Sequence, residues 1–91
     1  MIAATIWKFQ FDIGDQFTLW IPIRAKIIHV GMQGLYPYIW AIVNPEAQNT
    51  KRIFRVYGTG EPIIDIEDWK HVGTFSMHDG AYIWHLFEQK S

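Results

Sequence analysis

The sequence predicts an all-β domain, built as a compact small barrel or sandwich of about seven short antiparallel strands. Three observations predict it. Apolar and polar residues alternate with a period of two along several short stretches. Turn residues, chiefly Gly, Pro, Asn and Asp, separate these stretches. No segment of about ten or more residues combines a helical period with helix caps. We therefore expect one β domain over residues 1–91.

The first two strands are expected within residues 5–11 and 17–23. In the first stretch Trp7 shares one face with two phenylalanines, and polar residues occupy the other face. This pattern is typical of a half-buried strand. The second stretch alternates in the same way and contains Pro22. Because proline cannot donate a ladder hydrogen bond, this strand should lie at a sheet edge or end there.

A hairpin is expected from residues 26–33 to residues 38–44, with Gln33 and Gly34 beginning its turn. Pro45 ends the second of these strands, because the residue before a proline is sterically restricted. The polar residues that follow are consistent with a surface loop or a single helical turn.

The next strand is expected over residues 52–59. Phe54 and Val56 lie on one face of it, and Arg55 and Tyr57 lie on the other. We expect the first pair in the core and the second pair at the surface.

An acidic connection, residues 61–68, holds four of the nine acidic residues of the chain. A pair of carboxylates for glycosidic chemistry and a calcium loop are both conceivable here. A calcium loop needs oxygen ligands at fixed alternating positions, and three isoleucines and a proline interrupt them. We expect instead a solvated loop that its isoleucines pin to the surface.

A closing hairpin is expected from residues 71–77 and 81–88, because Asp-Gly between alternating apolar runs is a strong hairpin signal. Its second strand carries large apolar groups on both faces. Such a strand should be central in its sheet or covered by another subunit. We expect Trp84 to be largely buried, and Trp84→Ala to cost roughly 3 to 5 kcal/mol of stability.

The charge and composition of the chain exclude several classes of protein. The net charge is −1, from eight basic and nine acidic residues, so long nucleic acid is not an expected partner. No window approaches the ~20 apolar residues of a membrane-spanning helix, so no membrane partner is expected. The absence of Cys excludes disulfides and thiolate zinc sites, and it fits a reducing cytoplasm.

Aromatic residues make up 16% of the chain and include five Trp. A domain of this size has a thin core that cannot hide all of them. We therefore expect a homo-oligomer, either a dimer or a tetramer, in which neighbouring chains cover part of this surface.

No residues carry a pattern typical of catalysis or of a metal site. The four His, at positions 29, 71, 78 and 85, lack the spacing of zinc ligands. His85 is expected to be a core or interface side chain bonded to a backbone group. Neither Ser stands in a nucleophile elbow. We predict no catalytic residue, no metal and no cofactor.

A candidate ligand site follows the exposed face of the strand at residues 52–59. An arginine fork can hold a phosphate, and a Tyr or Trp ring can stack on a base. Glycine-flanked amides can bind phosphate oxygens. The candidate ligand-binding residues are Arg52, Arg55, Tyr57, Gly58, Thr59, Gly60 and Trp40. The plainer alternative, an exposed strand face with a cation–π pair, stays open.

The order of several short motifs resembles a family of short tailed-phage proteins described as a domain of unknown function. The motifs are Trp7 to Phe9, Ala25 to Val30, Trp40 to Pro45, Tyr57 to Gly60, Val72 to Phe75 and Trp84 to Glu88. Small phage proteins of this kind are similar to viral sponges of the anti-CBASS type. The resemblance implies a protein of the infected bacterial cytoplasm that sequesters a cyclic nucleotide immune signal without cleaving it.

Two functions from different classes therefore compete. The first is a non-enzymatic sponge for a small, doubly charged nucleotide. The second is a structural or protein-interaction accessory that binds a host or virion protein through exposed Trp20, Trp40 and Trp69.

Overall fold

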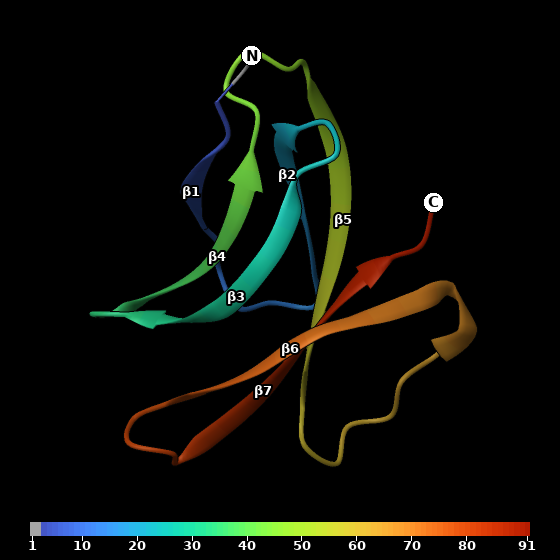
Figure 1. Ribbon diagram of the computed structural model, residues 1–91. Coiled ribbons are helices and arrows are strands. Elements are labelled where there is room, and N and C mark those ends of the chain that lie inside the picture. Colours follow the sequence, from blue (N-terminus) through green and yellow to red (C-terminus); the bar gives the residue numbers. More distant parts are fainter. Residues whose placement is uncertain (1–2) are drawn as a thin grey trace.

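The computed structural model describes residues 3–91 as two antiparallel sheets (Figure 1). Residues 1 and 2, with which the predicted domain begins, lie outside the described range. The strands are β1 (Thr5–Gln10), β2 (Gln16–Pro22), β3 (Lys26–Gln33), β4 (Tyr36–Val43), β5 (Asn49–Gly58), β6 (Trp69–Met77) and β7 (Tyr82–Gln89). The described residues contain one helical element, the 3-10 turn η1 (Ile66–Asp68).

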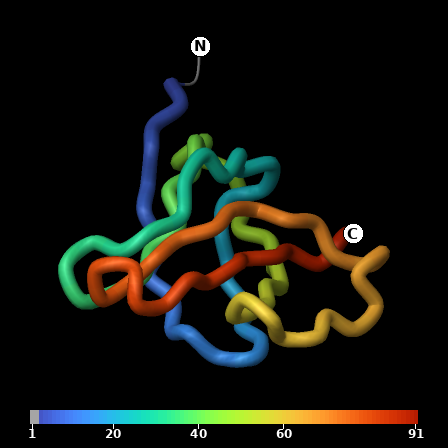
Figure 2. Tube along the Cα trace, turned by 90° about the horizontal axis from the view of Figure 1, so that it is seen from below, coloured from blue at the N-terminus to red at the C-terminus, as the bar shows by residue number. Residues whose placement is uncertain are grey.

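One sheet has three strands in the order β1-β4-β3, and the other has four in the order β2-β5-β7-β6. The two sheets pack as a sandwich and do not close into a barrel, which confirms the predicted all-β class. The long strand β5 runs through most of the height of the molecule in Figure 1. In Figure 2 the tips of the β3–β4 and β6–β7 hairpins lie side by side.

Alternation along the strands builds the core between the sheets. Phe54 from β5, Leu86 from β7 and Ile39 from β4 are among its fully buried side chains. A second, smaller cluster of buried side chains lies around Ile21 and Val43 and includes Ala25. Because successive side chains of a strand point to opposite faces, each sheet contributes every second residue to this interior.

The predicted hairpins and the edge position of Pro22 are confirmed. Pro22 is the last residue of β2, which is an edge strand. The β3–β4 hairpin turns at Gly34, whose φ of 62° suits glycine. β4 begins at Tyr36 and β5 at Asn49, so both strands start earlier than their patterns predicted. β5 starts early because pairing with β2 supplies the backbone partners of its polar first residues.

The closing hairpin has the predicted central strand, because β7 lies between β5 and β6. Trp84 differs from its prediction, since it is only half-buried. Its ring packs against the main core, and its Nε1–H donates to Met77 Sδ at 2.9 Å. The deeply buried side chain on this face of β7 is Leu86, because Trp84 lies nearer the open end of the sandwich.

Two further burial predictions are wrong, and one holds only in part. On the face of β1 that holds Trp7, Phe9 is half-buried, and Phe11, just after the strand, is buried, whereas Trp7 itself retains 40% of its surface. Ile64 and Ile66 are also exposed, so isoleucines do not pin most of the acidic connection. Trp69, predicted to be exposed, is buried with 5% of its surface accessible, beneath the stacked side chain of Arg55.

A close contact between β3 and β6 joins the two sheets along one side. A Cβ atom built on Gly73 would lie 2.6 Å from Val30 Cγ1. Gly73 follows a register shift in β6, where the ladder to β7 is irregular. The missing side chain and the bulge together allow the edge strand of one sheet to approach the other.

Candidate ligand-binding site

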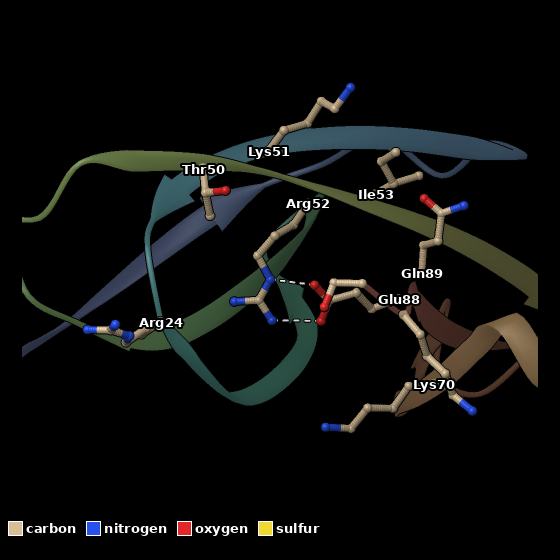
Figure 3. Close-up of a pocket in the computed structure, with 10 residues that line it drawn as sticks. Arg24, Thr50, Lys51, Arg52, Ile53, Lys70, Glu88 and Gln89 are labelled. Atoms are coloured by element: carbon tan, nitrogen blue, oxygen red, sulfur yellow. Dashed lines mark hydrogen bonds and ion pairs between the residues drawn. The ribbon is translucent and has the colours of Figure 1, made fainter.

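The basic residues of the chain gather around two adjoining cavities at one end of the sandwich. The larger, whose lining residues are drawn in Figure 3, has a volume of about 660 Å³, and the smaller about 350 Å³. Six of the eight basic residues line them: Arg24, Lys26, Lys51, Arg52, Lys70 and Lys90. His71 lines the smaller cavity as well. We call this set of residues the basic end.

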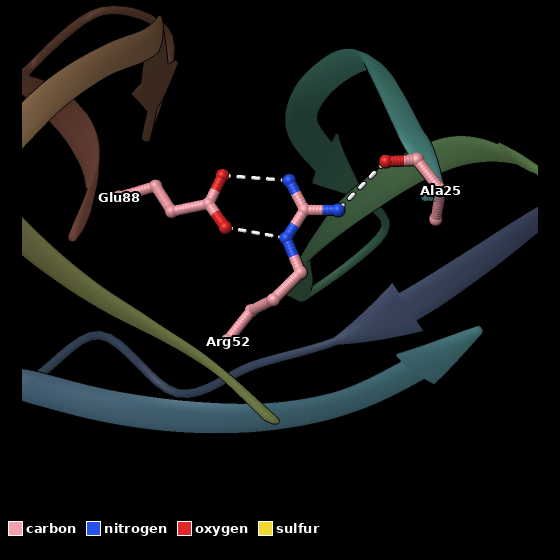
Figure 4. Close-up of polar contacts among 3 residues, drawn as sticks. All are labelled: Ala25, Arg52 and Glu88. Atoms are coloured by element: carbon pink, nitrogen blue, oxygen red, sulfur yellow. Dashed lines mark hydrogen bonds and ion pairs between the residues drawn. The ribbon is translucent and has the colours of Figure 1, made fainter. Parts of the chain in front are cut away.

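Arg52 makes three side-chain hydrogen bonds at the basic end (Figure 4). Its Nε–H donates to Glu88 Oε2, and its Nη2–H donates to Glu88 Oε1 at 2.6 Å. A third donor, Nη1–H, reaches the carbonyl oxygen of Ala25 at 2.7 Å. Ala25 immediately precedes β3 of the other sheet, so the guanidinium links the two sheets. Arginine donates bidentately to a carboxylate in this geometry.

Glu88 is the only acidic side chain among the described residues that line these cavities. Its carboxylate is already paired with Arg52. Among the described residues that line the cavities, Arg24, Lys26 and Lys70 therefore have no acidic side chain of their own as a partner. A site with such an excess of positive charge attracts a small anion that carries more than one negative charge.

The register of the four-stranded sheet explains how the basic end forms. Glu88 of β7 lies opposite Lys70 of β6 on one side and Phe54 of β5 on the other. Arg52 lies two residues before Phe54 and so shares its inward face. These charged side chains follow the core residues along the same face, where the sandwich opens to solvent. In Figure 3 Lys51 points away from Arg52, as the next residue of a strand must.

Arg24 reaches the basic end from a tight turn. The N–H of Ala25 donates to the carbonyl oxygen of Pro22 at 3.1 Å, and Arg24 has a φ of 63°. Glycine or asparagine usually occupies this position of such a turn, because a side chain there is strained. Strain of this kind at a non-glycine residue is common at functional sites.

The exposed face predicted as the site has a different character. Arg55 and Tyr57 do share the outer face of β5, and Arg55 Nη1 lies 3.3 Å from Tyr57 Oη. The guanidinium of Arg55 stacks on the Trp69 ring, 4.1 Å from its centroid, and also donates to Gln16. A cation–π pair is thus present on this strand face, with Trp69 as the ring.

Carboxylates border this face where a phosphate would lie. The cavity beside Arg55 has a volume of about 290 Å³ and is lined by both Asp15 and Glu61. A Cβ atom built on Gly58 would lie 2.9 Å from Glu61 Oε1, so that carboxylate covers the Gly-Thr-Gly exit. Two acidic side chains this close to Arg55 disfavour a doubly charged anion.

Comparison with known proteins gives one match, to a family model that covers residues 2–91 and is described as Domain of unknown function (DUF7352). The chain belongs to this family. No curated protein and no solved structure matches it.

The structure separates the residues of this DUF7352 member that were predicted to form one site. Arg55, Tyr57 and Thr59 lie on the outer face of the four-stranded sheet. Arg52 instead faces inward, because it lies an odd number of positions before Arg55. Trp40 lies on β4 of the other sheet, beside Tyr38. Arg52 is thus the one predicted residue at the basic end.

Hydrogen bonds on the outer face link four side chains in a row. His85 lies 2.8 Å from Thr59 Oγ1 through Nε2 and 3.0 Å from Thr74 Oγ1 through Nδ1. His71 Nε2 lies 3.2 Å from the same Thr74 oxygen. The prediction that His85 bonds to a backbone group is wrong, because both of its ring nitrogens lie within hydrogen-bond distance of threonine hydroxyl oxygens.

Sequence reasoning missed most of the basic end, since its members come from four separate segments of this family member. No sequence motif contains these residues, and a net charge near zero gives no sign that they cluster.

Within residues 3–91 no three His, Asp or Glu side chains gather as metal ligands would. No helix in the same range is long and apolar enough to cross a membrane.

Proposed function

We propose that this protein is a non-enzymatic binding protein that sequesters a small nucleotide with two phosphates, such as a cyclic dinucleotide. The observation that carries the proposal is the clustering of six of the eight basic residues around two adjoining cavities. A cavity of about 660 Å³ is within the usual range for a small-molecule site.

The chemistry of the basic end suits such a ligand. Lys70, Arg24 and Lys26 supply separate cations for two phosphates, while Arg52 is held by Glu88 and keeps the cavity wall rigid.

The resemblance to tailed-phage proteins supplies the biological setting. In the cytoplasm of an infected bacterium, binding of this kind removes a cyclic nucleotide signal of immunity from its receptors, as an anti-CBASS sponge does. Sequestration needs affinity and abundance but no catalytic group.

We also infer that the binding form is a homo-oligomer, either a dimer or a tetramer. β1 is paired on one side only, with β4, and leaves Ile6 56% and Trp7 40% exposed. An apolar edge strand of this kind is a ready partner for a second copy.

Calorimetry with a panel of cyclic dinucleotides tests the function directly. We expect one or more of them to bind, and the double variant Arg24→Gln and Lys70→Gln to weaken binding about 100-fold, from two charge-assisted contacts. The ligand recovered from the denatured complex should be chemically unchanged.

Variants on the opposite face serve as the matched control. Arg55→Ala and Tyr57→Ala remove the residues first predicted to bind the ligand, and both should bind like the parent. If these two variants lose binding while the double variant keeps it, the site lies on the outer face of β5. Cleaved product in the recovered ligand would identify an enzyme instead.

The alternative function is docking to a host or virion protein. It is favoured by a groove of about 420 Å³ between the two hairpin tips, lined by Met32, Leu35 and Met77 among others. Leu35 is 85% exposed there. Absence of binding to every cyclic dinucleotide in the panel would favour this alternative.

A further inference from the structure

The outer face of the three-stranded sheet carries a row of aromatic side chains that no other element covers. Tyr36, Tyr38 and Trp40 occupy alternate positions of the central strand β4, so all three point away from the core. Their neighbours between them, including Ile39, are buried in the sandwich. Tyr36 is 50% exposed, and the other two rings are half-buried.

Side chains from both edge strands hold these rings in place. Lys8 of β1 lies over the Tyr38 ring, with Nζ 4.8 Å from the ring centroid, and donates to Gln33 Oε1 at 2.5 Å. His29 of β3 lies 5.3 Å from Trp40 between ring centroids. Tyr38 and Trp40 are themselves 5.8 Å apart. The rings therefore lose little further freedom when a ligand stacks on them.

This face carries positive charge and no negative charge. The residues of β1, β3 and β4 include Lys8, Lys26 and His29, but none of the nine acidic residues of the chain. A second copy of the chain would bring these cations against one another, which opposes self-association through this face. The occupant that fits carries negative charge and flat rings.

We propose that the outer face of the β1-β4-β3 sheet binds a short stretch of single-stranded nucleic acid. Alternate residues of a strand lie about 6.8 Å apart, which matches one unstacked base for each ring of Tyr36, Tyr38 and Trp40. Lys8, on the flanking strand β1, contacts a phosphate. Open sheets with aromatic side chains bind two or three bases in this way in other proteins.

Fluorescence anisotropy with labelled ten-nucleotide oligothymidylate and oligouridylate, at 50 mM salt, tests the proposal. We expect binding of one or both, weakened about ten-fold by Trp40→Ala and by Tyr36→Ala. Tyr36 is a surface residue, so its variant reports on stacking even if Trp40→Ala folds poorly. Lys8→Gln should lower the slope of log affinity against log salt by about 0.7, the loss of one phosphate contact.

Two controls separate this face from the rest of the molecule. Trp20→Ala removes a more exposed Trp from the other sheet, and Lys70→Gln removes a cation from the basic end; neither should weaken the binding of the oligonucleotide. The proposal is overturned if neither oligonucleotide binds, or if Lys70→Gln weakens binding and Trp40→Ala does not. It is also overturned if Trp40→Ala converts a dimer to a monomer and no oligonucleotide binds.

Discussion

Arg24 has a left-handed backbone conformation, which is strained for any residue that carries a side chain. A φ of 63° at the third position of a turn suits glycine, and an arginine there costs about 1 to 2 kcal/mol. The same turn places Arg24 among the residues that line the larger cavity of the basic end. We attribute the strained residue to the need for its charge, since nothing else at this position favours a long side chain.

Arg24→Gly should therefore separate stability from binding. We expect the free energy of unfolding to rise by about 0.5 to 1 kcal/mol, the strain relieved less the entropy that glycine loses on folding. Urea unfolding measures the first effect, and calorimetry with the cyclic dinucleotide measures the loss of affinity. Lys51→Gly, in extended backbone on β5, is the control and should destabilise the fold. A less stable Arg24→Gly variant would contradict the strain argument.

In the closing hairpin, strand β7 makes apolar contacts on both of its faces. Leu86, fully buried, completes the core between the sheets, and Trp84 on the same face covers its open end. On the other face Phe87 packs against the rings of Tyr57 and His71. β7 thus has apolar contacts on both sides because it is the third of four strands, with a neighbour at each edge.

Truncation along β7 should follow burial rather than side-chain size. We expect Leu86→Ala to cost about 3 to 5 kcal/mol, because it leaves a closed cavity. Trp84→Ala should cost about 2 kcal/mol, since part of the ring already contacts solvent. Thermal or urea unfolding of both variants gives the order, with Ile83→Ala, on the exposed face, as a mild control. A larger loss for Trp84→Ala would place that ring deeper in the core.

At the scale of the whole molecule, the basic side chains cluster although the charges nearly cancel. Six basic residues lie at one end, and the acidic connection before β6 ends beside them, since the N–H of Lys90 donates to the carbonyl oxygen of Asp68 at 2.9 Å. The strands of the β1-β4-β3 sheet, in contrast, hold no acidic residue. Local fields, rather than the net charge of −1, therefore determine which anions the surface attracts.

The exposed edge at β1 leads to a prediction about assembly. We expect sedimentation velocity at micromolar concentration to show a dimer or tetramer. Trp7→Glu should yield a monomer, because it places a charge on the apolar edge strand. Trp20→Glu, at an exposed position of the other sheet, should leave the assembly unchanged. A parent protein that sediments as a monomer would remove the inference.

The sequence by itself determined the all-β class, the seven strands and both hairpins, and it gave a central β7 as one of two alternatives. It could do so because alternation, turn residues and proline act over a few neighbouring positions. It also placed Arg55 and Tyr57 correctly on one face. Only the tertiary structure decided that Arg52 faces inward toward Glu88, that Trp69 lies beneath Arg55, and that Trp40 belongs to the opposite surface. Only it could bring Arg24, Lys70 and Lys90 together, because strands distant along the chain meet through sheet pairing, and periodicity carries no information about which strands pair.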